Sequence, residues 1–310
     1  MSPSDVPILV VIRDPASQRR LLRQLRLMGH PAIGVSHACV GSVVLQLRSF
    51  ELVIIDNDMG SPAILTQPSL GQGMMQTVPR IRIGQSDDPT VMPMELSSEE
   101  LGEWIQDHVD SRGSGSLLPR KPLRVRVVNK LLSFIESSGI ETEASARRAA
   151  NRSALTCRTL GLSLSECQKG AVSAMLRNTG QAALQGVNPK DVSLDHTIAA
   201  REVMNAVPSL LPLRDPILCF RERWDGSGTP SGWNGEDIPV LARVIAGIDH
   251  YEEIVRSGLS HEHAIQRLED LAGVAFDPRI VEAIKSASKL EHWNREMATA
   301  SVNQSIESVA

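Results

Sequence analysis

The chain of 310 residues has few aromatic side chains, few cysteines and no long apolar run. Phe, Trp and Tyr make up only 3% of it, so aliphatic side chains must build its cores. Its four cysteines, Cys39, Cys157, Cys167 and Cys219, form no CxxC pair, which indicates reduced thiols rather than a disulfide framework. The apolar run at 7–12 is too short for a signal peptide or a membrane span.

The charge balance limits the classes of partner. A formal net charge of −4 argues against non-specific binding of nucleic acid. Together with the absence of a long apolar run, it leads us to expect a soluble cytoplasmic protein. Neither nucleic acid nor a membrane is expected as its partner.

The first third of the chain alternates short apolar runs with amphipathic stretches. This alternation predicts a doubly wound α/β domain over residues 1–110, in which helices separate the strands of a parallel sheet. The predicted strands are "PILVVI" (7–12), "AIGV" (32–35), "ELVIID" (51–56) and "PRIRI" (79–83), and the predicted helices are 16–28, 38–48 and 97–109.

The rest of the chain shows no convincing strand pattern. Residues 111–122 are polar and rich in Gly, Ser and Pro, which predicts a linker. An all-α domain is predicted for 123–295 and a flexible tail for 296–310. Its helices are expected at 123–138, 194–205, 239–256, 260–271 and 278–290, and in two stretches that end in Gly161 and Gly180, which suit helix C-caps.

The N-terminal domain resembles a response-regulator receiver, the phosphorylated module of two-component signalling. "ELVIID" places Asp56 at the phosphoacceptor position of that family. The family's acidic pair aligns with Ile12 and Arg13, which leaves only Asp14 nearby. Gly84 stands where a hydroxyl is expected, and the family's lysine falls near Met94. Phosphoryl transfer needs a cation to offset charge on the phosphate oxygens, so we expect Asp56 to be silent and the receiver to be degenerate.

The stretch "FRERWDGSGTPSGWNGEDIP" (220–239), hereafter the signature loop, combines glycines, prolines, two tryptophans and several charges. Glycines permit positive φ angles and close backbone approach, and tryptophans can anchor a loop on a helical bundle. The loop closely resembles that of HD-GYP domains, cyclic-di-GMP phosphodiesterases of the HD superfamily. The resemblance covers about 122–290, and Thr229 replaces the Tyr that gives GYP its name.

The resemblance implies a metal centre made by His, Asp and Glu side chains on facing helices. Glu141, His196 and Asp249 match retained ligand positions. The remaining catalytic positions are replaced: the family's "LLHDIGK" is "MLRNTGQ" here. The replaced positions are Ser145, Arg177, Asn178, Gln181, Phe220 and Arg221. We therefore expect Arg177 and Arg221 to pair with Glu141 and Asp249 in place of metals, and we expect no cofactor; the alternative is a single Fe, Mn or Zn ion.

These replacements predict a catalytically inactive HD-GYP pseudoenzyme that acts through protein contacts in a bacterial cyclic-di-GMP-type network. In this family the signature loop is associated with GGDEF diguanylate cyclase domains, so such a domain is a candidate partner. A homodimer through helix 123–138 is a second possibility. One alternative function is a phosphodiesterase with a reduced metal site. The other is a sensor that binds a cyclic dinucleotide without cutting it, since arginines suit phosphate recognition. The candidate ligand-binding residues are Arg177, Arg221, Arg223, Trp224, Asp225, Gly226, Gly228, Thr229, Pro230 and Arg256.

Overall fold

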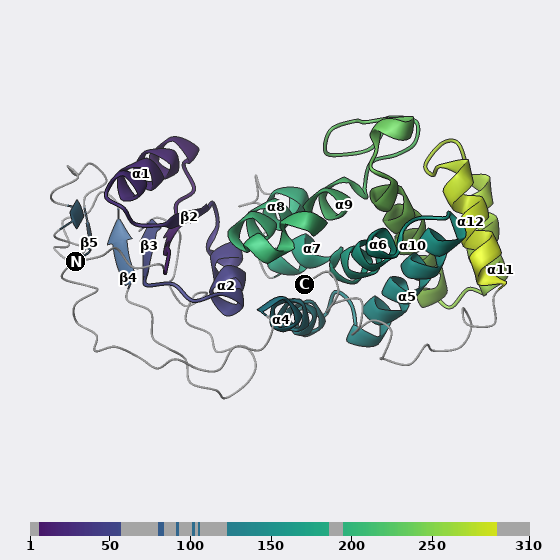
Figure 1. Ribbon diagram of the computed structural model, residues 1–310, viewed down its shortest axis with the longest axis horizontal. Coiled ribbons are helices and arrows are strands. Elements are labelled where there is room, and N and C mark those ends of the chain that lie inside the picture. Colours follow the sequence, from purple (N-terminus) through teal and green to yellow (C-terminus); the bar gives the residue numbers. More distant parts are fainter. Residues whose placement is uncertain are drawn as a thin grey trace. The chain divides into compact units, whose positions relative to one another are not determined.

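The chain divides into two compact units, residues 1–119 and 120–310. The computed structural model describes residues 6–56, 80–83, 91–92, 101–102, 105, 123–185 and 195–289. Figure 1 shows a small sheet with helices in the first unit and a set of packed helices in the second. The predicted linker (111–122) and tail (296–310) lie outside the described residues, so the proposed domain boundaries stay predictions.

The first unit contains a small parallel sheet. Its five strands lie in the order β2-β1-β3-β4-β5, which is one of the two common orders of doubly wound folds. The bounds are β1 Ile8–Val11, α1 Pro15–Leu27, β2 Ala32–Val35, α2 Ala38–Leu47, β3 Leu52–Asp56, β4 Arg80–Ile83 and β5 Val91–Met92. The predicted parallel sheet is therefore confirmed, whereas the receiver-like assignment stays a prediction. Of the predicted helix 97–109, only Leu101, Gly102 and Ile105 are described, and these are helical.

Local sequence explains the elements around β1. All four residues of β1 are buried, as expected for a central parallel strand. Asp14 begins α1, since its side chain accepts a hydrogen bond from the Ser17 amide at 2.8 Å. The α1 residues Leu21 and Leu25 are buried against the sheet, and its arginines lie on the exposed side.

The regular elements in the described part of the second unit are all helices, apart from one isolated β-bridge between Ala272 and Phe276. Helix α10 packs against α5, α6, α9, α11 and α12, so it forms the centre of the unit. The bounds are α4 Leu123–Ser137, α5 Glu143–Thr159, α6 Leu164–Leu176, α7 Thr179–Ala183, α8 His196–Ala206, η3 Pro208–Leu213, α9 Arg214–Cys219, η4 Gly235–Asp237, α10 Val240–Arg256, α11 His261–Asp270 and α12 Pro278–Ser288.

The two predicted glycine caps have different outcomes. Gly161 follows α5 with φ +75°, a left-handed conformation that glycine adopts without strain. Gly180, in contrast, lies inside α7, and α6 already ends at Leu176. A Cβ on Gly180 would lie 2.0 Å from the backbone oxygen of His196. The predicted cap at Gly180 is therefore wrong, because this glycine instead allows α7 and α8 to approach closely.

Helix α4 buries five apolar residues within the second unit. They are Val127, Val128, Leu131, Leu132 and Ile135, and each is at most 3% exposed. Their spacing gives the single apolar face of an amphipathic helix, which packs against α5, α6 and α7. None of the helices in the described part of the chain is long and apolar enough to cross a membrane.

Candidate functional site

Arg177 is buried within the helical unit and binds two carboxylates. It directly follows α6, and its side chain is only 1% exposed. Nε donates to Asp249 Oδ1 at 2.6 Å, Nη2 to Glu141 Oε1 at 2.7 Å and Nη1 to the Ala174 carbonyl at 2.8 Å. Burial alone would lower the pKa of Arg177, but the charges of Asp249 and Glu141 outweigh it and raise that pKa above its ordinary value.

Two further replaced positions also contact Glu141, whose side chain is fully buried. The Ser145 hydroxyl donates to Glu141 Oε1 at 2.8 Å, and Asn178 Nδ2 donates to Oε2 at 3.0 Å. Ser145, Arg177 and Asn178 together give both Glu141 oxygens hydrogen-bond donors, as a buried carboxylate requires. We call these residues, with Glu141 and Asp249, the Arg177 cluster. The predicted pairing of Arg177 with Glu141 and Asp249 is present in it.

The residues of this cluster do not fit a metal ion. A divalent cation about 4 Å from the Arg177 guanidinium would be repelled by roughly 8 kcal/mol at an effective dielectric constant of about 20. His196, the third predicted ligand position, bonds through Nδ1 to Asp195 Oδ1 at 2.6 Å. Throughout the described ranges, no group of three or more His, Cys, Asp or Glu side chains could hold a metal ion.

The signature loop is held by a buried carboxylate that the sequence did not reveal. Glu222 is 3% exposed, and its two oxygens accept hydrogen bonds from the amides of Ser231 at 2.6 Å and Gly232 at 3.1 Å. The loop therefore closes on Glu222. Gly228 lies so close to the start of the loop that a Cβ there would be 2.2 Å from the Arg223 nitrogen, which explains the need for glycine.

A second set of contacts fixes the loop to the turn before α12. The Trp224 and Asp225 amides donate to the carbonyls of Ala275 at 3.1 Å and Val274 at 3.0 Å. The Arg243 guanidinium lies 5.7 Å from the centre of a Trp224 ring and donates to Asp277 Oδ2 at 2.6 Å. No motif or spacing in the sequence pointed to this Arg243–Asp277 pair, which comes from residues 34 positions apart.

The two loop tryptophans differ in their surroundings. Trp224 is half-buried by the contacts above, as expected for an anchor. Trp233 is 42% exposed, so the prediction that it also anchors the loop is wrong. Thr229 and Pro230 are exposed as well, and Gly226 has φ +83°, in the left-handed region that favours glycine. The middle of the loop therefore faces solvent.

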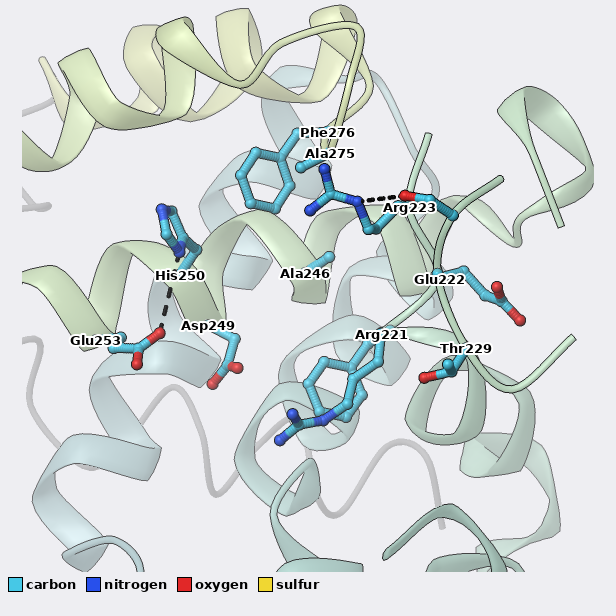
Figure 2. A pocket seen from close by; sticks show the side chains of 13 residues that line it. Arg221, Glu222, Arg223, Thr229, Ala246, Asp249, His250, Glu253, Ala275 and Phe276 are labelled. Atoms are coloured by element: carbon cyan, nitrogen blue, oxygen red, sulfur yellow. Dashed lines mark hydrogen bonds and ion pairs between the residues drawn. The ribbon is translucent and has the colours of Figure 1, made fainter. Parts of the chain in front are cut away.

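A pocket of about 400 Å³ lies between the signature loop and α10 (Figure 2). Asp249, His250 and Glu253 contribute from α10, and Arg221 and Arg223 contribute from the loop. The complete lining is Phe220, Arg221, Glu222, Arg223, Ser227, Gly228, Thr229, Ala246, Asp249, His250, Glu253, Ala275 and Phe276. Asp249 belongs to both the pocket and the Arg177 cluster, because its side chain is 29% exposed while one oxygen binds Arg177.

The four arginines predicted to bind a ligand are not brought together. Arg221 and Arg223 line the pocket, whereas Arg177 is buried beside it and Arg256 lies exposed at the end of α10. Arg223 Nε donates to Ser227 Oγ at 2.8 Å and lies 3.6 Å from Asp225 Oδ1. Any phosphate clamp in this pocket would therefore use the loop arginines alone.

Arg221 differs from the prediction made for it. It is exposed and makes no ion pair with Glu141 or Asp249; its guanidinium lies 5.3 Å from the centre of the Phe220 ring. Burial lowers the pKa of His196, and the charge of Arg221 lowers it further. The predicted pairing of Arg221 with the carboxylates is therefore wrong, since this side chain faces the pocket instead of the Arg177 cluster.

The other replaced positions have separate surroundings. Phe220 is 6% exposed and packs with Ala174 and Ile245 beneath the pocket. Gln181, at the position of the family's lysine, is exposed on α7 and does not line the pocket. In the first unit, Asp56 ends β3 and is half-buried.

Of the neighbours predicted for Asp56, the structure describes Ile12, Arg13 and Asp14. Asp14 serves as the cap of α1, and hydrogen bonds from Ser17 lower its pKa. Ile12 is buried and Arg13 is exposed. Gly84 and Met94 lie outside the described residues, so it stays a prediction that Asp56 is not phosphorylated.

Comparison with known proteins places the helical unit in a family. Residues 127–280 match the HD domain family. The chain is 26% identical over 197 residues to the cyclic di-GMP phosphodiesterase response regulator RpfG of Xanthomonas campestris pv. campestris, covering 58% of the chain and 52% of that relative. It is 25% identical over 189 residues to the 3′3′-cGAMP-specific phosphodiesterase 2 of Vibrio cholerae, covering 56% of the chain and 35% of that relative.

A solved structure of a cyclic GMP-AMP-specific phosphodiesterase of V. cholerae also matches, with a TM-score of 0.43 and 17% identity, over 59% of this chain and 53% of that one. The chain spans about half the length of the X. campestris response regulator (52%) and about a third of the length of the V. cholerae phosphodiesterase 2 (35%).

The family corrects one expectation about cofactors. HD domain phosphodiesterases such as these relatives normally use a metal cofactor, so the inference that a protein of this kind has none is wrong. Within this chain, the residues of the Arg177 cluster do not fit such an ion, because the Arg177 guanidinium occupies the Glu141 and Asp249 carboxylates.

The helical architecture, the signature loop and the matched residues agree with one another. The chain contains an HD domain over residues 127–280, and its similarity to cyclic di-GMP and cGAMP phosphodiesterases supports its assignment to the HD-GYP family.

Proposed function

We propose that this chain is a non-hydrolysing signalling regulator of the HD-GYP type, which works through protein contacts in a cyclic-dinucleotide network. The network is suggested by the relatives, which carry the names cyclic di-GMP and 3′3′-cGAMP-specific phosphodiesterase. Because the chain spans only part of those relatives, their activities serve here as a guide to the class of signal and not as a description of this protein.

The observation that carries the proposal is the position of Arg177. Hydrolysis of a phosphodiester needs an activated nucleophile and a group that takes up its proton. Glu141 is fully buried and both its oxygens accept hydrogen bonds, and one Asp249 oxygen is bound to the same guanidinium. Both Glu141 oxygens are thus occupied by donors from this chain, so neither is free to contact a substrate or an attacking water.

The exposed part of the signature loop supports the proposed action through protein contacts. Trp233, Thr229 and Pro230 face solvent on a loop whose base is fixed by Glu222 and by the turn at 274–275. A fixed loop that exposes a tryptophan suits a protein interface, since aromatic side chains often dominate binding energy. A GGDEF domain remains the candidate partner that we propose for it.

A homodimer through helix 123–138 would need a particular side of that helix. The apolar face of α4 that runs from Val127 to Ile135 is buried inside the unit, whereas Phe134 is half-buried and Asn129 and Lys130 are exposed. A dimer through α4 would therefore use its polar side.

The second candidate function is a sensor that binds a cyclic dinucleotide without cutting it. One observation favours it: Arg221 and Arg223 both line the pocket beside the loop. In such a sensor Arg177 would not contact the ligand, because its guanidinium is already bound to the Glu141 and Asp249 carboxylates.

Turnover of cyclic di-GMP tests the proposal. We expect the full chain, supplied with Mn²⁺ or Fe²⁺, to release no linear product above a blank without protein. The matched control is Glu141→Gln, checked for folding by circular dichroism. Turnover by the parent chain that disappears in the folded Glu141→Gln variant would contradict the proposal, because it would show that Glu141 takes part in hydrolysis.

A further inference from the structure

The signature loop contains an Asn-Gly pair that the proposed function does not use. Asn234 is exposed just before η4, its side chain does not cap that turn, and Gly235 follows it. The side-chain amide of an asparagine can be attacked by the backbone nitrogen of the next residue, and glycine hinders this attack least because it has no Cβ. A Cβ on Gly235 would have no heavy atom within 4 Å, so the space beside this residue is open.

Two features of the folded loop hold this pair in an unreactive geometry. The Gly235 amide, whose nitrogen is the nucleophile, donates a hydrogen bond to the Trp224 carbonyl at 3.0 Å. An N–H held in this way keeps its proton, whereas attack requires the nitrogen to give it up. The ψ angle of Asn234 is 157°, an extended value that turns the Gly235 nitrogen out of the plane of the five-membered ring that the attack must close. The reaction therefore needs the loop to open first.

The contacts of Trp224 decide how readily the loop opens. The Trp224 amide donates to the Ala275 carbonyl at 3.1 Å, and the Arg243 guanidinium lies 5.7 Å from the centre of a Trp224 ring. Arg243 also donates to Asp277 Oδ2 at 2.6 Å, two residues beyond Ala275. The carbonyl that holds Gly235 thus belongs to a residue that Arg243 and the turn before α12 keep in place. Removing the Arg243 charge should therefore free the Gly235 amide.

We propose that Asn234 is a modification site that reacts only while the signature loop is open. The Gly235 nitrogen attacks Asn234 Cγ and closes a cyclic imide as the Cγ–Nδ2 bond breaks, and ammonia leaves with the proton from the Gly235 nitrogen. Water then opens the imide at either of its two carbonyls. The products are aspartate and isoaspartate at position 234, and water is the co-reactant. This inference goes beyond the proposed function, which involves no covalent change.

The modification changes both the charge and the backbone of the loop. Either product adds a carboxylate to an exposed stretch that already carries Glu236 and Asp237 and lies next to Trp233. Isoaspartate also lengthens the main chain by one carbon, just before the amide that binds the Trp224 carbonyl. The modified loop should therefore close less well, and it should bind an acidic partner less tightly than the parent loop does.

Peptide mapping by mass spectrometry tests the assignment. The purified full chain is incubated at mildly alkaline pH, which favours loss of the amide proton, beside a free peptide of residues 231–237. We expect the folded chain to convert Asn234 at least tenfold more slowly than the peptide, and the chain unfolded in denaturant to react at the rate of the peptide. Asn234→Gln should abolish the conversion. Exposed Asn205, which precedes Ala206 in α8, is the internal reference and should stay unmodified in the folded chain.

A variant and its control test whether loop opening limits the reaction. Arg243→Met, checked for folding by circular dichroism, should speed conversion at Asn234 at least threefold, and hydrogen exchange of the Gly235 amide should rise with it. The matched control, Arg158→Met, removes an exposed arginine of the same unit and should leave both rates within twofold. In the parent chain, low concentrations of denaturant should raise the two rates in parallel, which tests the same point without any variant.

Three results would overturn the inference: conversion of the folded chain at the rate of the free peptide, a folded Arg243→Met variant that reacts no faster than Arg158→Met, or no conversion of Asn234 in the unfolded chain. Each of these leaves the proposed absence of hydrolysis untouched. Turnover of cyclic di-GMP, in contrast, would overturn the proposed function whatever happens at Asn234.

Discussion

Arg177 and Arg221 lie near the same pocket, at two positions where the family resemblance implies histidines, and they have opposite surroundings. Arg177 is 1% exposed and binds two carboxylates and a carbonyl. Arg221 is exposed and makes no ion pair within the described residues, and its guanidinium lies 5.3 Å from the centre of the Phe220 ring. An arginine in place of a histidine thus neutralises two carboxylates inside the unit at position 177, and it remains exposed to solvent at position 221.

The difference shows that burial decides what an introduced charge does. A buried guanidinium is tolerated only when carboxylates compensate for its lost hydration, so Arg177 contributes to the fold. An exposed guanidinium keeps its hydration and stays available to a ligand. Arg243 lies between them: its side chain is 11% exposed, and it pairs with Asp277. These three arginines form a series in which a charge-removing substitution should have a falling effect on stability.

The largest effect is expected for Arg177→Met, which keeps much of the side-chain length and removes the charge. Glu141 and Asp249 would lose their shared partner, and breaking a buried ion pair typically costs about 3–5 kcal/mol. Denaturant unfolding of the full chain at pH 7 measures it, with tryptophan fluorescence as the signal. That signal reports mainly on the second unit, which contains Trp224, Trp233 and Trp293.

The control for Arg177→Met is Arg158→Met, in which an exposed arginine of the same helical unit is changed. This variant should unfold within about 0.5 kcal/mol of the parent. Equal stabilities of the Arg177 and Arg158 variants would show that the Arg177 cluster does not stabilise the unit.

The fold was largely predictable because its signals are local. Apolar runs of strand length gave the parallel sheet, and amphipathic periods gave the helical unit. The error at Gly180 has a different origin. A glycine after an apolar helix pattern looks like a cap, whereas its real constraint is the His196 carbonyl on another helix, which no periodicity records.

The site was predictable only in part. The signature loop was recognised from its own residues, and the pairing of Arg177 followed from its place among retained carboxylates. The Glu222 carboxylate and the Arg243–Asp277 pair were missed, because their partners are amides or distant residues without a motif. Arg221 was assigned the wrong partner, since the sequence does not tell which way a side chain points at the start of a loop.

An intermediate effect is expected for Arg243→Met. Asp277 would lose one charged donor but keep its hydrogen bonds from Arg279, so a loss of about 1.5–3 kcal/mol at pH 7 is expected. Burial alone would raise the pKa of Asp277, but the hydrogen bonds from Arg279 and Arg243 outweigh it and lower that pKa.

This shift fixes how the effect of Arg243→Met depends on pH. A lowered pKa in the folded state means that the stabilisation is complete above the ordinary carboxyl pKa of about 3.9 and is lost as the pH falls through the lowered value. The gap between variant and parent should therefore be constant near neutral pH and should close in acid. Unfolding curves at pH 7 and at successively lower pH measure it, and a gap that widens in acid would contradict this account of Asp277.

The smallest effect on stability is expected for Arg221→Met. Its guanidinium has no ion pair in the described part of the chain, so nothing is left uncompensated when the charge is removed. Exposed substitutions of this kind usually change the free energy of unfolding by less than about 0.5 kcal/mol. Arg256→Met, at the exposed end of α10, should behave in the same way and serves as its control. In a cyclic-dinucleotide sensor, the second candidate function, only Arg221→Met would weaken ligand binding, because Arg221 alone of the pair lines the pocket. A loss above about 1 kcal/mol in Arg221→Met, with Arg256→Met unchanged, would mean that Arg221 stabilises the folded unit, and the contrast with Arg177 would then be one of degree.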